Sequence, residues 1–232
     1  MLKRSVDIVL AGMLFVFTLP ILAIAAIAIK LDSEGPVIFR QDRMGRGFKR
    51  FQLLKLRTMR PCCEGSAYTL GADSRITRAG RWLRWLKFDE FPQLWNVLRG
   101  DMSIVGPRPV IPELTFEFRW EYERLLMVRP GLTDPAAIKY CREAEFFAGI
   151  PEPFKYFKAV VTPDKLRISM DYLAKADVMS DFGVMVKTAM VLYVVDTCPR
   201  SKSRAKERIA ETVKQVEGST EGYIEIAANR VA

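Results

Sequence analysis

The sequence contains no histidine and only four cysteines. Without an imidazole, catalytic triads that use a histidine base and zinc sites with histidine ligands are excluded. Two of the cysteines, Cys62 and Cys63, are adjacent, while Cys141 and Cys198 stand alone. None has the two-residue spacing of zinc knuckles or redox motifs, so we expect reduced thiols that bind no metal. Any general acid or base must therefore be a carboxylate, lysine, tyrosine or cysteine.

Positive charge is concentrated in one segment. The 232-residue chain has a formal net charge of +9, and residues 37–60 hold eight Lys or Arg against one Asp. Such a block suits nucleic acid, anionic lipid headgroups or phosphorylated substrates, and its neighbour here is an apolar segment. The chain length fits one well-packed domain plus a membrane element. We therefore predict a catalytic domain over residues 32–200 and a charged tail over 201–232.

The amino-terminal segment lacks charge from Ile8 to Ile29. It is long enough to span a bilayer, which takes about 20 residues. A cleaved signal peptide is disfavoured, because the stretch exceeds the usual ~7–15 apolar residues and has no small-residue cleavage site. A single-pass helix is opposed by Pro20, which predicts a kink, and by basic residues at both ends, which favour one membrane face. We therefore predict that residues 1–31 form a re-entrant membrane helix.

Two short extended runs predict a basic β-hairpin after the membrane segment. Residues 37–41 and 51–56 lie on either side of the turn residues Gly45, Arg46 and Gly47. We expect this hairpin to lie close to the membrane.

Residues 74–87 combine basic and aromatic side chains at helical spacing. Arginines at intervals of three lie beside Trp82 and Trp85, which suits a helix at the lipid interface. A solvated helix with buried tryptophans is the alternative. Further helices are predicted over residues 112–127, 163–174 and 181–195. The predicted fold is α+β and mainly helical, with a re-entrant membrane helix, interfacial amphipathic helices and a small basic β-hairpin.

Asp89 and Glu90 start the clearest helical pattern in the chain. Its apolar face is formed by Phe91, Leu94, Trp95 and Leu98. Acidic residues are common in a helix's first turn, where they cap free amides, so the pair alone favours a structural interpretation. Basic residues in the same half of the sequence favour a functional interpretation instead: Lys55, Arg57, Arg81, Arg84, Arg99 and Arg108. Carboxylates among arginines suit an anionic substrate with Mg²⁺, and a carboxylate can also be a nucleophile that forms an acyl phosphate. Arg108, set between prolines, is a candidate phosphate clamp.

Several ordered blocks together resemble the bacterial sugar transferase family. They are KRSVDIVL, KLDSEGPVIFRQDRMGRGFKRFQLLKLRTM, SRITRAGRWLR and FDEFPQLWNVLRGDMSIVGPRP. Members of this family, the monotopic phosphoglycosyl transferases, start polysaccharide and glycan assembly on polyprenyl phosphate. The resemblance covers residues 2–133 and, weakly, the helices after Pro163. Larger members carry further membrane helices and a domain ahead of this core, so we expect the short, core-only form.

The resemblance implies a transfer in two steps. Asp89 would attack the diphosphate of a UDP-sugar, expel UMP and hold the phosphosugar covalently until undecaprenyl phosphate accepts it. Glu90 would assist, either in binding Mg²⁺ together with Asp89 or as the base for the acceptor. Lys55, Arg84 and Arg108 match basic positions that would contact phosphates or the carboxylate pair.

Two departures from the family pattern stand out. Pro20 matches the proline that breaks the re-entrant helix, but Leu19 stands where a serine is common. After the Arg-Pro-Gly turn, Asp134 and Pro135 replace Gly and Trp. Arg142, a further candidate for substrate binding, aligns only if one residue is inserted. The identity of the donor sugar is therefore not fixed by the sequence.

The resemblance implies a place at the bacterial inner membrane, with the catalytic domain facing the cytoplasm. Expected partners are the UDP-sugar, polyprenyl phosphate and membrane lipids, with a homo-oligomer as a further candidate and no nucleic acid, because no groove-reading motif is present. One alternative is a non-enzymatic, membrane-anchored basic protein that binds anionic lipids or partner proteins. Another is direct transfer in a ternary complex, in which the carboxylates only hold metal.

Overall fold

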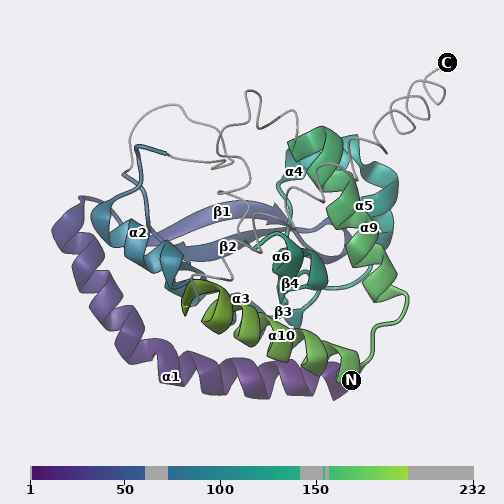
Figure 1. Cartoon of the computed structure of the whole chain (residues 1–232), viewed down its shortest axis with the longest axis horizontal. Helices are drawn as coiled ribbons and strands as arrows, with labels where there is room; N and C mark the ends of the chain where they lie inside the picture. The colour runs from purple at the N-terminus through teal and green to yellow at the C-terminus, as the bar shows by residue number, and fades with distance from the viewer. Residues whose placement is uncertain (1, 61–72, 142–153, 155–156, 198–232) are drawn as a thin grey trace.

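The computed structural model describes residues 2–60, 73–141, 154 and 157–197, with side chains described as far as residue 192. Within these residues the protein is mostly helical with a few short strands, which confirms the predicted class. Figure 1 shows a long amino-terminal helix curving along one side of a body that contains a central hairpin. The predicted tail over 201–232 and the cysteines Cys62, Cys63 and Cys198 lie outside the described residues.

Helix α1 spans Leu2–Asp32 and continues through Pro20, so it is curved rather than broken (Figure 1). Proline lacks an N–H and crowds the carbonyl four residues earlier, which frees backbone groups that nearby hydroxyls can satisfy. The Thr18 hydroxyl donates a hydrogen bond to the Phe15 carbonyl at 3.0 Å. A hydroxyl is therefore present one residue before Leu19, but it is bound to Phe15 and not to Val16, whose carbonyl loses its partner at Pro20.

Both ends of α1 are attached to the same body. Near the amino end, the Asp7 carboxylate accepts hydrogen bonds from the Ser103 hydroxyl at 2.8 Å and from the Ile104 N–H at 3.1 Å. At the carboxyl end, Asp32 accepts a hydrogen bond from the Ala79 N–H at 2.7 Å. Between these anchors, α1 is long and apolar enough to cross a membrane, and most of its apolar window is exposed. It is therefore not the core helix of this fold.

The predicted hairpin is present. Strand β1, Ile38–Met44, pairs antiparallel with β2, Arg50–Leu56, and the short 3-10 helix η1, Arg46–Phe48, joins them. Phe39 pairs with Lys55 and Gln41 pairs with Leu53. Because directly opposed residues share one face of a sheet, these four side chains point to the same side of the hairpin.

The segment after the hairpin contains α2, Arg78–Trp85, then the 3-10 turn η2, Phe88–Glu90, and then α3, Gln93–Arg99. The prediction that Asp89 and Glu90 start a regular helix was therefore wrong, because the left-handed conformation of Lys87 (φ 58°) leads into a separate turn. Trp82 and Trp85 are 66% and 48% exposed, which excludes the alternative with buried tryptophans.

The remaining elements differ from the prediction in two respects. The helix predicted over residues 112–127 is divided at Phe118 (φ −115°, ψ 45°). A parallel pair of three-residue strands, β3 (Ser103–Val105) and β4 (Gly131–Thr133), was not predicted. The helices of this part are α4 (Pro112–Glu117), α5 (Arg119–Leu125), α6 (Pro135–Lys139), the π-helical η3 (Phe157–Val161), α9 (Thr162–Leu173) and α10 (Val178–Thr197).

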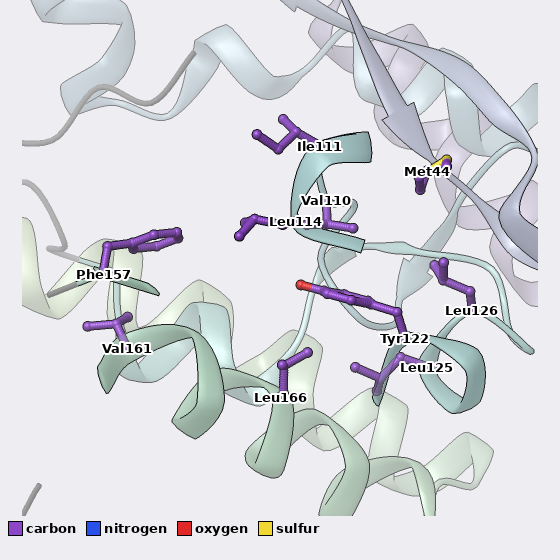
Figure 2. Close-up of a cluster of buried hydrophobic side chains, with 10 residues drawn as sticks. All are labelled: Met44, Val110, Ile111, Leu114, Tyr122, Leu125, Leu126, Phe157, Val161 and Leu166. Carbon is purple, nitrogen blue, oxygen red and sulfur yellow. The ribbon is translucent and has the colours of Figure 1, made fainter. Parts of the chain in front are cut away.

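One buried apolar cluster joins the end of β1 to the helices α4, α5 and α9 (Figure 2). Val110 and Ile111, at the start of α4, lie in it beside Met44, whose N–H donates to the Val110 carbonyl at 2.9 Å. Because a closely packed cluster is rigid, it holds the loop just before Val110 against the hairpin. That loop carries Arg108.

Candidate functional site

A cavity of 2110 Å³ lies beside the hairpin, between the η2 turn, the loop before α4 and the helices α6, α9 and α10. This exceeds the ~300–1,000 Å³ of ordinary ligand pockets and leaves room for more than one small substrate. Five predicted site residues line it: Lys55, Arg84, Asp89, Glu90 and Arg108. The structure therefore brings together residues that are spread over 53 positions of the sequence, from Lys55 to Arg108.

The two neighbouring carboxylates have different partners. Glu90 forms an ion pair with Arg108, and Lys55 Nζ lies 3.6 Å from the same oxygen, Glu90 Oε1. Asp89 is 9% exposed, and its Oδ1 is buried without a hydrogen-bond partner in the described part of the chain. Arg108 and Lys55 are therefore both paired with Glu90.

This asymmetry separates the pKa values of the pair. Burial and the adjacent Glu90 charge raise the pKa of Asp89, although Lys55 and Lys87 oppose the change. Burial alone would raise the pKa of Glu90 too, but Arg108 and Lys55 outweigh it and hold that pKa well below its usual range. Glu90 is therefore the permanently ionised member, while Asp89 lies closer to protonation.

Lys55 is held in the cavity by strand β2. Burial lowers the pKa of its ammonium group, and the attraction to Glu90 opposes this. Negative charge nearby therefore favours the charged form of this lysine. An anionic substrate would supply more of that charge.

Arg84 reaches the cavity from α2, and its Nε donates to the Thr58 hydroxyl at 2.8 Å. The helix approaches closely enough because residue 80 is glycine: a Cβ there would lie 2.1 Å from the Thr58 carbonyl oxygen. The positive charge of Arg84 also attracts the Asp89 carboxylate and so offsets part of the rise in the pKa of Asp89. Arg84 and Asp89 therefore line the same cavity as oppositely charged groups.

Other predicted residues lie elsewhere. Pro20 is within α1 and does not line the cavity. Arg142 lies outside the described residues. Asp134, the departure from the family pattern, accepts hydrogen bonds from the Ala137 N–H at 2.6 Å and from the Ser169 hydroxyl at 2.9 Å. It lines the cavity wall while it caps α6.

Two further residues line the same cavity: Arg57, which the sequence analysis counted only among the basic residues near the carboxylate pair, and Gln93, to which it assigned no role. Arg57 follows Lys55 by two positions, so strand alternation places both on one face. Gln93 follows Asp89 by four positions, is 2% exposed, and has a buried Nε2 without a partner in the described residues. The spacings were visible in the sequence, but the identity of the buried face was not.

Asp89 and Glu90 are the candidate carboxylate ligands for Mg²⁺. The described residues contain no group of three or more Asp, Glu, Cys or His side chains placed to hold a metal ion. Mg²⁺, however, commonly binds through one or two carboxylates plus substrate phosphates and water. Asp89, with its unpartnered Oδ1, fits such a site. Glu90 is engaged by two cations and fits it less well.

The structure combines an exposed apolar helix with a neighbouring cavity that holds a carboxylate pair and several cations. These features define a class of protein that binds anionic substrates next to an apolar surface. The chain belongs to the bacterial sugar transferase family, whose model matches residues 1–194. The family predicted from the sequence blocks is thereby confirmed.

The relatives differ in the sugar for which they are named. The chain is 39% identical over 199 residues to the UDP-glucose:undecaprenyl-phosphate glucose-1-phosphate transferase of Caulobacter vibrioides, covering 84% of this chain and 70% of that protein. It is 42% identical over 149 residues to the undecaprenyl-phosphate glucose phosphotransferase of Komagataeibacter xylinus, covering 60% and 28%. It is 39% identical over 142 residues to the UDP-N-acetylgalactosamine-undecaprenyl-phosphate N-acetylgalactosaminephosphotransferase of Aeromonas hydrophila, covering 59% and 34%.

Proposed function

We propose that this protein transfers a sugar-1-phosphate from a UDP-sugar to undecaprenyl phosphate and releases UMP, as the first membrane step of glycan assembly. The observation that carries the proposal is the division of the carboxylate pair, with Glu90 held by Arg108 and Lys55 while Asp89 keeps an unpartnered oxygen. The names of the relatives supply the two substrate classes. The sugar itself is not assigned.

In the first step, a carboxylate oxygen of Asp89 attacks the phosphorus that carries the sugar. The bond between this phosphorus and the bridging oxygen breaks, its electron pair leaves with UMP, and an acyl phosphate joins Asp89 to the phosphosugar. The arginines Arg84 and Arg108 and the ammonium of Lys55 face the negative charge that develops on the phosphate oxygens.

In the second step, a phosphate oxygen of the lipid acceptor attacks the same phosphorus. The acyl oxygen–phosphorus bond breaks, Asp89 regains its carboxylate, and the product is the lipid diphosphate sugar. Glu90, with its lowered pKa, is a weak base at neutral pH, since an efficient base has a pKa near the working pH. We therefore assign Glu90 to positioning Lys55 and Arg108.

Mg²⁺ is part of this proposal. Asp89 would hold the ion through Oδ1, with Glu90 as the second candidate ligand, and donor phosphates would complete its coordination. When bound, the ion supplies positive charge that neutralises the diphosphate.

We also propose that α1 is re-entrant and that the cavity faces the cytoplasm at the bacterial inner membrane. The support is that both ends of α1 are anchored to one body, through Asp7 and through Asp32. A helix that crossed the bilayer would place these anchors about 30 Å of hydrocarbon apart. The exposed tryptophans of α2, Trp82 and Trp85, then belong to the lipid interface.

The topology is tested with single cysteines at Leu2 and Lys49 in a cysteine-free background. Both positions are exposed. We expect both to be protected from a membrane-impermeant maleimide in intact spheroplasts and to react after permeabilisation. Labelling of only one position before permeabilisation would show a spanning helix and refute the proposal.

The function is tested by UMP release from a panel of UDP-sugars in the presence of undecaprenyl phosphate. We expect release with at least one donor, and loss of release in Asp89→Asn. A basic protein that only anchors lipids would release no UMP with any donor. Direct transfer in a ternary complex would leave no phosphosugar on the protein, so mass spectrometry after incubation with donor alone separates the two enzyme mechanisms.

A further inference from the structure

Arg57 is a buried cation without a carboxylate partner in the part of the chain that the structure describes. The residue is 5% exposed, and its Nη2 donates to both the carbonyl oxygen and the hydroxyl of Ser33, at 2.7 and 3.0 Å. Its Nε and Nη1 are buried and have no hydrogen-bond partner among the described residues. A guanidinium carries five N–H donors, so three of them are unused. A buried charge in this condition is strongly unfavourable until an anion joins it.

A structural role explains only part of this arrangement. Ser33 directly follows α1, and a cation beside the carboxyl end of a helix is favourable. That interaction uses Nη2 alone. The remaining donors belong to a side chain that lines the cavity two positions after Lys55. Helix capping therefore does not account for the burial of the whole guanidinium.

The three cavity cations expected to contact phosphate, Lys55, Arg84 and Arg108, already have partners. Arg108 and Lys55 are paired with Glu90, and Arg84 is bound to Thr58. A transfer from a diphosphate donor to a phosphate acceptor presents a further phosphate group after the first has reacted. Arg57 is the described cavity cation whose guanidinium is buried and whose unused donors can take that group.

The position of Arg57 indicates whether it binds a phosphate of the UDP-sugar donor or the phosphate of the lipid acceptor. Through Ser33 it is fastened to the residue that follows the apolar helix. An anion held there lies where α1 returns to the body, which is the place at which a lipid headgroup would enter. A soluble nucleotide has no reason to be bound at that point.

We propose that Arg57 binds the phosphate monoester of the lipid acceptor and serves the second step of transfer. This inference rests on the proposed function. It predicts that the two half-reactions respond differently to substitution of one residue, because the nucleophile Asp89 serves both steps while Arg57 serves one.

The half-reactions are measured separately on the full chain in detergent. UMP release with donor alone reports the first, and decay of the isolated phosphosugar enzyme with polyprenyl phosphate reports the second. For Arg57→Gln we expect the first to stay within about 2-fold and the second to slow by at least about 10-fold with a raised acceptor KM, a typical loss for a charged phosphate contact. Arg57→Lys should lie between these values. Arg50→Gln, an exposed residue on β2 that does not line the cavity, is the matched control and should change neither step.

A slowed first step in Arg57→Gln would assign the arginine to the donor and overturn the proposal. Unchanged rates in both steps would do the same and leave only the helix-end role. Thermal unfolding is measured for each variant, and if Arg57→Gln does not fold, Arg57→Lys is judged by the same criteria.

A binding experiment without donor identifies the source of the phosphate. In nanodiscs, wild-type protein should bind polyprenyl phosphate at least about 10-fold more tightly than Arg57→Gln does, whereas neutral polyprenol should not distinguish the two. Equal competition by inorganic phosphate would show a general phosphate site and overturn the lipid assignment. The binding experiment can be interpreted even if the wild-type protein releases no UMP with any donor. That result would refute the proposed function and not the assignment of Arg57 to the lipid phosphate.

Discussion

Arg108 forms an ion pair with Glu90, while Oδ1 of the neighbouring Asp89 has no hydrogen-bond partner in the part of the chain that the structure describes. Two adjacent carboxylates in one turn therefore occupy different electrostatic environments. One is fixed as an anion between two cations, and the other is buried with its charge incompletely compensated. The proposed division of labour between Asp89 and Glu90 rests on this difference in their partners.

Replacing Asp89 with asparagine should abolish turnover and stabilise the protein. The raised pKa means that the ionised carboxylate is less favourable in the fold than in the unfolded chain, so at neutral pH it costs stability. Asparagine removes that charge with little change of shape. We expect a gain of roughly 0.5–2 kcal/mol in the free energy of unfolding, together with loss of UMP release. Chemical denaturation in detergent and the UMP assay check both.

The exposed Asp42, which lies on β1 outside the cavity, provides the control. Asp42→Asn should leave activity unchanged and stability within about 0.5 kcal/mol. A destabilised Asp89→Asn protein would show that the carboxylate is held for structural reasons.

The first half-reaction should depend on pH through Asp89. Only the carboxylate is a nucleophile, so the rate of UMP release with donor alone should fall as the pH is lowered through a pKa above the ordinary value of about 3.9. Glu90→Gln removes the repulsion that raises this pKa and frees Lys55 and Arg108 to act on Asp89. The acid limb should then move to lower pH in a single-turnover pH–rate profile. A shift to higher pH would contradict the asymmetry described above.

The sequence predicted the elements whose patterns are long and regular. The hairpin over residues 38–56 and the helices α9 and α10 follow from alternation and helical spacing. The strands β3 and β4 escaped prediction, because three residues are too few to show a period. Phe118, where α4 and α5 separate, carries no breaker residue that would mark the division.

The candidate site shows the same limit. Motif blocks selected Lys55, Arg84 and Arg108, and the structure brings these side chains to one cavity with the carboxylate pair. Pairing between particular side chains depends on tertiary packing, so the sequence could not say that Arg108 chooses Glu90. Nor could it show that Arg57 is buried, since an arginine beyond the end of a strand is usually exposed.

Removing the charge of Arg108 should weaken donor turnover far more than stability. Arg108→Gln leaves Glu90 with Lys55 alone, raises the pKa of Glu90 and removes a fork that matches phosphate oxygens. We expect kcat/KM for the UDP-sugar to fall by about 10–100-fold, with partial recovery in Arg108→Lys. Steady-state UMP release measures this. Arg119→Gln, which breaks an exposed ion pair with Glu123 at 3.1 Å, should change activity by less than about 2-fold.

Asp7 should be needed to hold the amino end of α1 against the body. Asp7→Ala leaves the Ser103 hydroxyl and the Ile104 N–H buried without their acceptor. We expect a loss of about 2–4 kcal/mol in the free energy of unfolding, since both bonds are made to a buried charged group. Chemical denaturation gives the magnitude, and limited proteolysis should cut near the amino end of α1 sooner. Ser5→Ala, an exposed change in the same helix, should have neither effect; equal behaviour of the two variants would contradict the anchor.

Gly80 should be irreplaceable because α2 lies directly against the end of β2. An alanine Cβ at this position would lie 2.1 Å from the Thr58 carbonyl oxygen, so the helix would have to move away from the residue whose hydroxyl fixes Arg84. Alanine is intrinsically the better helix former by roughly 1 kcal/mol, but a backbone clash of this kind outweighs it. We expect Gly80→Ala to lose about 2–3 kcal/mol of stability and to slow UMP release. Gly183→Ala in α10 is the matched control, because a Cβ there meets nothing within 4 Å. It should be neutral or more stable by up to about 1 kcal/mol. If both alanines were tolerated equally, the position of Arg84 would not depend on the close approach of α2.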